Sequence, residues 1–145
     1  MNDPQQELFT EIRQQLVLRY GEGSYADPAN SGKVYDGPLP PAETPYPFIY
    51  LAESRQNDDM RNKSVILSQN YQDIHVWHDA PGKRGTLSQM MMTVKEICSN
   101  ISHTRSYRFA YRGAQQTILE DTTTGRTLIH GVITVEYQLL GGYDS

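Results

Sequence analysis

The fold is decided by residues 86–101, which read TLSQMMMTVKEICSNI. Apolar side chains recur along this stretch with the period of an α-helix that buries one face. The residues on this apolar stripe are Leu87, Met90, Met91, Val94, Ile97, Cys98 and Ile101. Thr86 and Gln89 have the spacing of a capping box, so we expect the helix to begin at Thr86. The sequence therefore predicts a helix that packs along a sheet.

A second helix is predicted near the N-terminus. Asp3 can cap this helix, and Pro4 suits its first helical position. Apolar residues with helical spacing follow at Leu8, Phe9, Ile12 and Leu16. Gly21 is expected to end the helix.

Four segments are rich in β-branched and aromatic residues, a composition that predicts strands. They are residues 46–53, 65–77, 107–118 and 133–139. The last segment alternates strictly, which is typical of a strand with one face on a core and one face wet or at an interface. In the second segment the apolar phase changes between Tyr71 and Ile74. That change predicts a bulge, or a strand whose faces switch surroundings.

The order of these elements is α-β-β-α-β-β, which indicates the α+β class. We expect a mostly antiparallel sheet of about four strands with both helices packed on one face, because two helices and one sheet need a shared apolar layer. A chain of 145 residues has the usual size of one domain. Residues 1–145 are therefore expected to form a single domain.

Residues 21–45 predict a long loop that is rich in glycine and proline. Between Gly21 and Pro47 the chain has four glycines and six prolines, which disfavour both helix and central strand. Loops longer than about 12 to 15 residues are uncommon in compact domains unless they are functional or disordered. We expect residues 24–41 to contact another molecule, and a mobile excursion is the alternative.

Charge and hydropathy exclude several classes of function. The formal net charge of −4 argues against a protein that coats nucleic acid, since such proteins bind phosphates through clustered Lys and Arg. No apolar run approaches the roughly 20 residues that span a bilayer, and residues 1–4 lack the features of a secretory signal. We expect a protein that is made and kept in a cytoplasm, without a membrane partner. The single cysteine, Cys98, fits a reducing compartment.

The motifs of phosphate loops, nucleophile elbows, zinc proteases and redox dithiols do not occur in the sequence. His75, His78 and Asp79 come closest to an acid–base or metal cluster, but side chains three residues apart on a strand point to opposite faces. Cys98 lies on the apolar helical stripe, where burial raises the pKa of a thiol. We therefore expect no catalytic residue, no cofactor and no metal. An enzyme that uses His75, His78 and Asp79 is kept as a third hypothesis.

Tyrosine is the distinctive residue of the composition, with ten copies against three phenylalanines and one tryptophan. Tyrosine is favoured where a surface must be both wet and adhesive, as it is between subunits. The tyrosines outside the predicted core phase are the candidate interface residues: Tyr25, Tyr35, Tyr71 and Tyr143. The alternative is that they only end strands and loops.

Several features occur in a characteristic order. They are an N-terminal helix, VYD at 34–36, a proline-led PYPFIYL at 45–51, IHVWH at 74–78, a glycine turn into the striped helix, and GRTLIHGVI at 125–133. This layout resembles the small tail-terminator, tail-completion or head–tail joining (neck) proteins of tailed bacteriophages, over nearly the whole chain. Two features depart from the family pattern, namely the loop at 21–44 and the polar residues at 68–73.

The resemblance implies a structural virion protein of the tail or neck that is present in the host cytoplasm during assembly. It implies a ring of six copies that caps the tail tube and docks to the head connector. Its partners would be its own copies, the tail tube protein and the connector or stopper protein, with DNA passing through the lumen without specific binding. The family brings no catalytic residues. The alternative is a small dimeric α+β module that binds a ligand or regulates.

Overall fold

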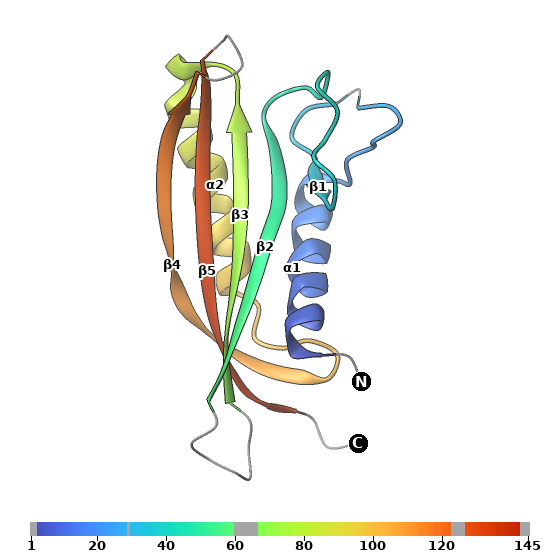
Figure 1. Cartoon of the computed structure of the whole chain (residues 1–145), viewed down its shortest axis with the longest axis vertical. Helices are drawn as coiled ribbons and strands as arrows, with labels where there is room; N and C mark the ends of the chain where they lie inside the picture. Colours follow the sequence, from blue (N-terminus) through green and yellow to red (C-terminus); the bar gives the residue numbers. More distant parts are fainter. Residues whose placement is uncertain (1–2, 29, 60–66, 123–126, 143–145) are drawn as a thin grey trace.

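The computed structural model describes residues 3–28, 30–59, 67–122 and 127–142 (Figure 1). Within these residues the elements are α1 (Pro4–Tyr20), β1 (Val34–Asp36), β2 (Phe48–Asp59), β3 (Leu67–His78), a 3₁₀ turn η1 (Pro81–Lys83), α2 (Arg84–Ser99), β4 (Tyr107–Asp121) and β5 (Leu128–Gly142). The strands form one sheet in the order β1-β2-β3-β5-β4. Only the pairing of β1 with β2 is parallel among these strands. The α+β class is therefore confirmed.

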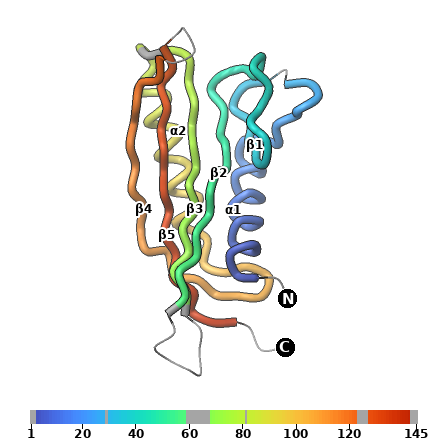
Figure 2. The backbone as a smooth tube through the Cα atoms, in the orientation of Figure 1, coloured from blue at the N-terminus to red at the C-terminus, as the bar shows by residue number. Residues whose placement is uncertain are grey.

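The described sheet has five strands, whereas about four were expected. The additional strand is β1, which lies inside the predicted loop at 21–45 and pairs with Ile49, Tyr50 and Leu51 of β2. Val34 and Tyr35 are buried with 2% and 1% of their surface exposed. A strand of three residues among prolines and glycines has no periodicity that sequence reasoning could detect. The rest of this segment stays at one end of the molecule (Figure 2).

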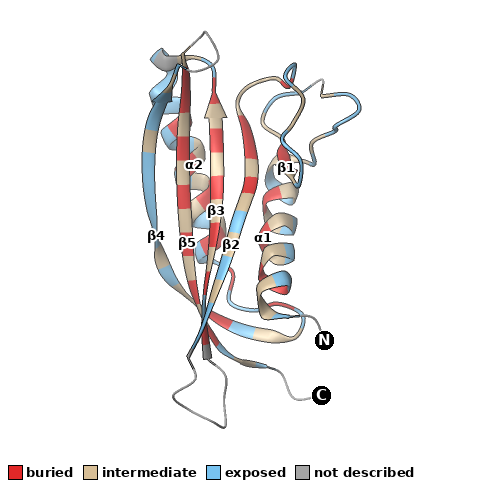
Figure 3. Ribbon diagram, in the orientation of Figure 1, coloured by how far each residue is buried: buried red, intermediate tan, exposed pale blue. Residues whose placement is uncertain are grey.

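One apolar cluster joins both helices to a single face of the sheet. Helix α2 contributes Leu87, Met91, Val94 and Cys98, and α1 contributes Leu8, Ile12 and Leu16. Buried and partly exposed residues alternate along β5, as the coloured bands in Figure 3 show. Neither helix is long and apolar enough to cross a membrane.

The two helices begin in different ways. The carboxylate of Asp3 accepts hydrogen bonds from the backbone of Gln5 at 2.9 Å and Gln6 at 3.3 Å, which confirms the predicted cap of α1. The expected capping box of the second helix is wrong. Helix α2 begins at Arg84, because the 3₁₀ turn η1 leads straight into it, and Thr86 lies inside its first turn.

The phase change predicted in the second strand has a different origin from the one expected. Burial alternates regularly along β3 from Ser68 to His78, so β3 itself has no phase change in that stretch, and Val65 lies outside the described residues. The register shift is instead in β2, between Leu51 and Ser54. Gln72 is 1% exposed, and its amide donates hydrogen bonds to the carbonyls of Ala52 and Glu53 at 3.3 and 3.2 Å. A buried polar residue on β3 therefore satisfies backbone groups that the bulge in β2 releases.

Gly131 lies where α2 approaches the sheet closely. A Cβ atom at Gly131 would lie 2.5 Å from the Sδ atom of buried Met91, whereas one at Gly82 would meet nothing within 4 Å. We predict that Gly131→Ala lowers the free energy of unfolding by about 1–3 kcal/mol, because the core would be overpacked. In the double variant that also carries Met91→Ala, the loss of unfolding free energy should be smaller than the sum of the two single losses by about 0.5 kcal/mol or more.

Urea denaturation of the four proteins of this cycle measures the coupling, with Gly82→Ala as the control. Equal unfolding midpoints for Gly131→Ala and the control would contradict the close approach.

Candidate functional site

The sheet face opposite the helices carries a row of aromatic and imidazole rings. The Trp77 ring stacks on His130 with centroids 3.7 Å apart and planes 8° from parallel. His130 also stacks on His75 at 4.6 Å, and Tyr50 meets His75 edge to face at 6.4 Å. These four residues, here called the aromatic row, are all partly exposed, because both helices pack on the other face. They come from β2, β3 and β5.

The register of the strands brings these rings together. Trp77 is opposite His130 in the pairing of β3 with β5. His75 precedes Trp77 by two residues on β3 and therefore lies on the same face. The Nδ1 atom of His75 lies 2.5 Å from the Nε2 atom of His130. When both imidazoles are neutral, one ring nitrogen donates the hydrogen bond and the other accepts it.

Burial keeps this histidine pair uncharged at neutral pH. The pKa of His130 is lowered to about 4, chiefly by partial burial and also by the neighbouring His75, while Asp121 opposes the shift. Partial burial also lowers the pKa of His75, against the opposing effect of Asp73 and Glu53. The aromatic row is therefore a neutral patch on a chain with 21% charged residues.

The other half of the uncovered face is polar and internally paired. The carboxylate of Asp73 accepts a hydrogen bond from Thr134 at 2.6 Å and pairs with Arg55 at 3.2 Å. The Arg55 guanidinium lies 5.4 Å from the centroid of the Tyr71 ring. An open hollow of about 370 Å³ lies here between β2 and β4; its lining residues are Arg55, Tyr71, Arg112, Gly113, Ala114, Gln115, Thr134 and Glu136.

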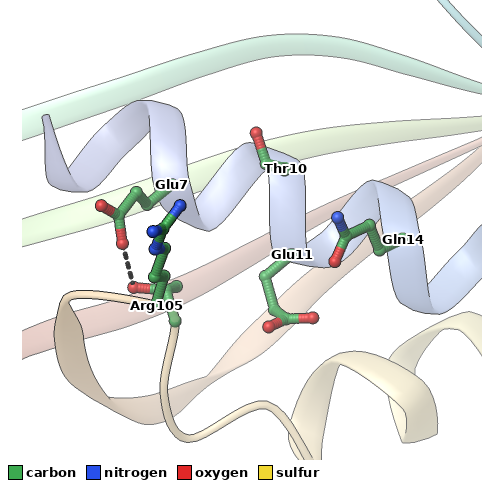
Figure 4. A pocket seen from close by; sticks show the side chains of 6 residues that line it. Glu7, Thr10, Glu11, Gln14 and Arg105 are labelled. Atoms are coloured by element: carbon green, nitrogen blue, oxygen red, sulfur yellow. Dashed lines mark hydrogen bonds between the residues drawn. The ribbon is translucent and has the colours of Figure 1, made fainter. Parts of the chain in front are cut away.

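A second hollow, of about 240 Å³, lies where α1 meets the segment before β4 (Figure 4). Glu7 is 6% exposed, and its Oε1 atom accepts hydrogen bonds from the Thr104 hydroxyl and the Ser106 backbone, both at 2.8 Å. This carboxylate joins the first helix to the start of β4. Glu11 and Arg105 lie on the rim of the hollow. Since Glu7 is already bonded to the chain, we assign it a structural role.

The predicted interface tyrosines lie in different environments in the structure. Tyr25 is 39% exposed, and its hydroxyl donates to the carbonyl of Pro38 at 2.7 Å. Tyr71 lies on the uncovered face, where its hydroxyl donates to Gln69 at 3.1 Å. Both keep ring surface that a neighbour could contact. Tyr143 lies outside the described residues.

The expectation that Tyr35 lies outside the core is wrong. Its ring is 1% exposed and meets Tyr25 and Phe48 edge to face at 5.3 and 5.9 Å. A Cβ atom at Gly23 would lie 2.4 Å from this ring. The predicted loop folds back over Tyr35 because β1 pairs with β2, so this side chain has no surface to offer a neighbour.

The three residues of the enzyme hypothesis do not gather at one site, although the Nδ1 atom of His78 lies 3.4 Å from a carboxylate oxygen of Asp79. His75 lies on the uncovered face, whereas His78 is 8% exposed on the other face, and its Nδ1 accepts a hydrogen bond from the Ala80 backbone at 3.2 Å. Burial raises the pKa of the Cys98 thiol to about 12, which disfavours the nucleophilic thiolate. In the described ranges, no three His, Cys, Asp or Glu side chains gather in a way that could hold a metal ion.

Sequence reasoning missed the aromatic row. Trp77 and His130 are 53 positions apart, and only the pairing register of β3 with β5 makes them neighbours. The available signal was that Trp77 lies out of phase with Ile74 and Val76, which indicates a ring on the uncovered face.

Comparisons with known proteins extend the description of the fold. No family model matches the chain, and no curated protein matches its sequence. A solved structure described as "Virion of native gene transfer agent (GTA) particle" contains a chain of similar fold, with a TM-score of 0.62 and 16% sequence identity. The alignment covers 92% of this chain and 95% of that chain. At this identity the similarity shows a shared fold, and it extends over nearly the whole of both chains.

The histidine pair makes the stability of the protein depend on pH. A histidine whose pKa is lowered from 6.5 to about 4 on folding binds its proton more tightly in the unfolded state. Stability is therefore highest above about pH 6.5 and falls as the pH drops toward 4. We predict that His130→Gln reduces the loss of unfolding free energy between pH 7.5 and pH 5 by about 1 kcal/mol.

Urea denaturation at both pH values measures this loss. His103→Gln is the control, because His103 is exposed and lies outside the aromatic row. If His130→Gln lost as much stability as the wild-type protein, the pair would not be the cause.

Proposed function

We propose that this chain is a structural subunit of a tailed-phage-like particle, in the ring that ends the tail and joins it to the head. The observation that carries the proposal is the fold similarity to a chain of a gene transfer agent virion, over 92% of this chain and 95% of that one. An alignment of this extent concerns the whole architecture and not a shared motif. The layout of sequence features points to the same class of protein.

The shape of the molecule supports contacts along an axis. The segment between α1 and β2 gathers at one end, and the end of β2 and the start of β3 lie at the opposite end (Figure 2). In a ring whose axis follows the strands, these two ends would face the two axial neighbours. The tail tube would lie on one side and the head connector on the other.

The electrostatic properties also suit a particle through which DNA passes. A net charge of −4 disfavours tight binding of phosphates, because like charges repel. On the uncovered sheet face Arg55 forms an ion pair with Asp73, and Arg112 donates a hydrogen bond to the uncharged amide of Gln138. Under this proposal the chain acts through assembly and has no catalytic role.

The proposal predicts assembly on a tail tube. Purified protein is examined by negative-stain electron microscopy alone at high concentration and after mixing with purified tail tubes. We expect rings of six copies, or a cap at one end of each tube, because a terminator recognises the last ring of the tube.

Tubes alone and tubes mixed with another acidic protein of similar size are the controls. Uncapped tubes, together with a dimer whose melting temperature rises with a small ligand, would overturn the proposal in favour of the dimeric ligand-binding module.

A further inference from the structure

Strand β4 forms one edge of the sheet, and most side chains in its second half are exposed (Figures 1 and 3). Backbone hydrogen bonds at its start join Tyr107 and Phe109 to residues 102–104. From Ala110 to Glu120, the backbone hydrogen bonds between described residues run to β5 alone. This stretch contains neither proline nor lysine, two residues that commonly protect an exposed edge. The edge can therefore pair with another strand.

A bulge bounds the accessible part of this edge at one end, and two acidic residues bound it at the other. The register with β5 shifts just before Gly113, and Arg112 falls within this bulge. Residues 113–119 then follow in continuous register with β5. Glu120 and Asp121 come directly after them. The two ends of the stretch therefore carry opposite charges.

This charge pattern is complementary to itself when two copies of the stretch run antiparallel. The exposed Arg112 of each copy then comes near Glu120 and Asp121 of the other copy. A parallel pair would instead set Arg112 beside Arg112. Opposite charges across paired strands stabilise the pairing, whereas like charges destabilise it. Because both partners are the same segment, their free lengths are also equal.

A register centred on Gln116 matches the side chains of the uncovered face in size. This register sets Leu119 of one copy opposite Gly113 of the other, and the two-fold axis produces the contact twice. Both residues lie on the uncovered face, because their partners in β5 are His130 and Glu136. Leu119 is 51% exposed, whereas a Cβ atom at Gly113 would meet nothing within 4 Å. An exposed apolar side chain thus meets the open space beside a glycine.

The same register also matches the side chains on the helix side of the sheet. It sets Ile118, which is partly buried against the core cluster, opposite the small and exposed Ala114. The polar Gln115 lies opposite the polar Thr117. A shift of two residues in either direction would lose the pairing of Leu119 with glycine. The side chains therefore favour the register centred on residue 116.

We propose that two copies of this chain pair through β4, with residues 113–119 of both copies antiparallel and Gln116 on the two-fold axis. The two sheets then join into one. A contact between identical surfaces closes after two copies, so a ring whose two sides meet different neighbours uses other contacts. The dimer is thus a state of the free chain, and this inference goes beyond the proposed ring. Pairing covers an edge that would otherwise invite aggregation.

Disulfide formation between introduced cysteines tests this register. Gln115, Gln116 and Thr117 are consecutive and all exposed, so their cysteine variants differ only in position. Gln116→Cys should form a covalent dimer under mild oxidation, because the two-fold axis sets its two copies opposite each other. The native Cys98 is 0% exposed, so the wild-type protein shows the background on a non-reducing gel.

The two neighbouring variants are the matched controls. Gln115→Cys and Thr117→Cys should each stay monomeric on the gel when oxidised alone, because their own copies lie beyond the Cα separation of about 7 Å that a disulfide spans. An equimolar mixture of the two should form a covalent dimer, since residue 115 lies opposite residue 117. Covalent dimers from Gln115→Cys alone, with none from Gln116→Cys, would overturn the register. Absence of covalent dimers in all four samples would overturn the contact.

Sedimentation velocity of the wild-type protein measures the contact without any substitution. We expect a species of twice the 16.5 kDa of the chain that dissociates on dilution. A monomer at every concentration would overturn this inference, whatever the protein does on tail tubes. A dimer that forms while tubes stay uncapped would support it and count against the ring alone.

A lysine variant provides an independent test of the edge. Gln115→Lys with Thr117→Lys sets like charges opposite each other twice, which should raise the Kd of the dimer about tenfold. Gln14→Lys is the control, since Gln14 is exposed on α1, and it should leave the Kd unchanged. A circular dichroism spectrum like that of the wild-type protein establishes that the double variant is folded. A folded double variant with the wild-type Kd would overturn the β4 contact.

Discussion

The packing of α2 across β5 is the contact on which the rest of the structure depends. Met91 occupies the space above Gly131, and the buried Tyr137 hydroxyl donates to the carbonyl of Cys98 at 2.6 Å near the end of the helix. Gly131 and Tyr137 lie on the same face of β5. They fix which side of the sheet is covered, and so they leave the aromatic row and the polar hollow on the other side.

The main elements of the fold could be predicted from the sequence because their signals are local. The stripe from Leu87 to Ile101 has a helical period, and Asp3 with Pro4 marks a helix start. Strand β1 could not be predicted, since three residues carry no period. Tyr35 shows the same limit, because its burial depends on a pairing with β2 that no local pattern encodes. The polar residues of β3 stand out in the sequence, but their role depends on the partner strand. Gln72 of β3 donates hydrogen bonds to the carbonyl groups of the bulge in β2.

The candidate site depended even more on non-local information. Two of the predicted interface tyrosines, Tyr25 and Tyr71, keep exposed surface, and a third is buried. The aromatic row needs residues from three strands in one register, so it appears only when the pairing of β3 with β5 is known. Composition alone could indicate an adhesive surface, because tyrosine is abundant, but it could not place that surface.

The uncovered face and the sheet edges differ in whether their hydrogen-bonding groups already have partners within the chain. On the face, the imidazoles of His75 and His130 bond to each other, and Asp73 is bonded by both Thr134 and Arg55. A partner that used these polar groups would have to displace bonds within the chain. From Ala110 to Glu120 of β4, the backbone hydrogen bonds between described residues run to β5 alone. Each bond made there with a second copy would replace only a bond to water, so the edges offer a neighbour more than the face does.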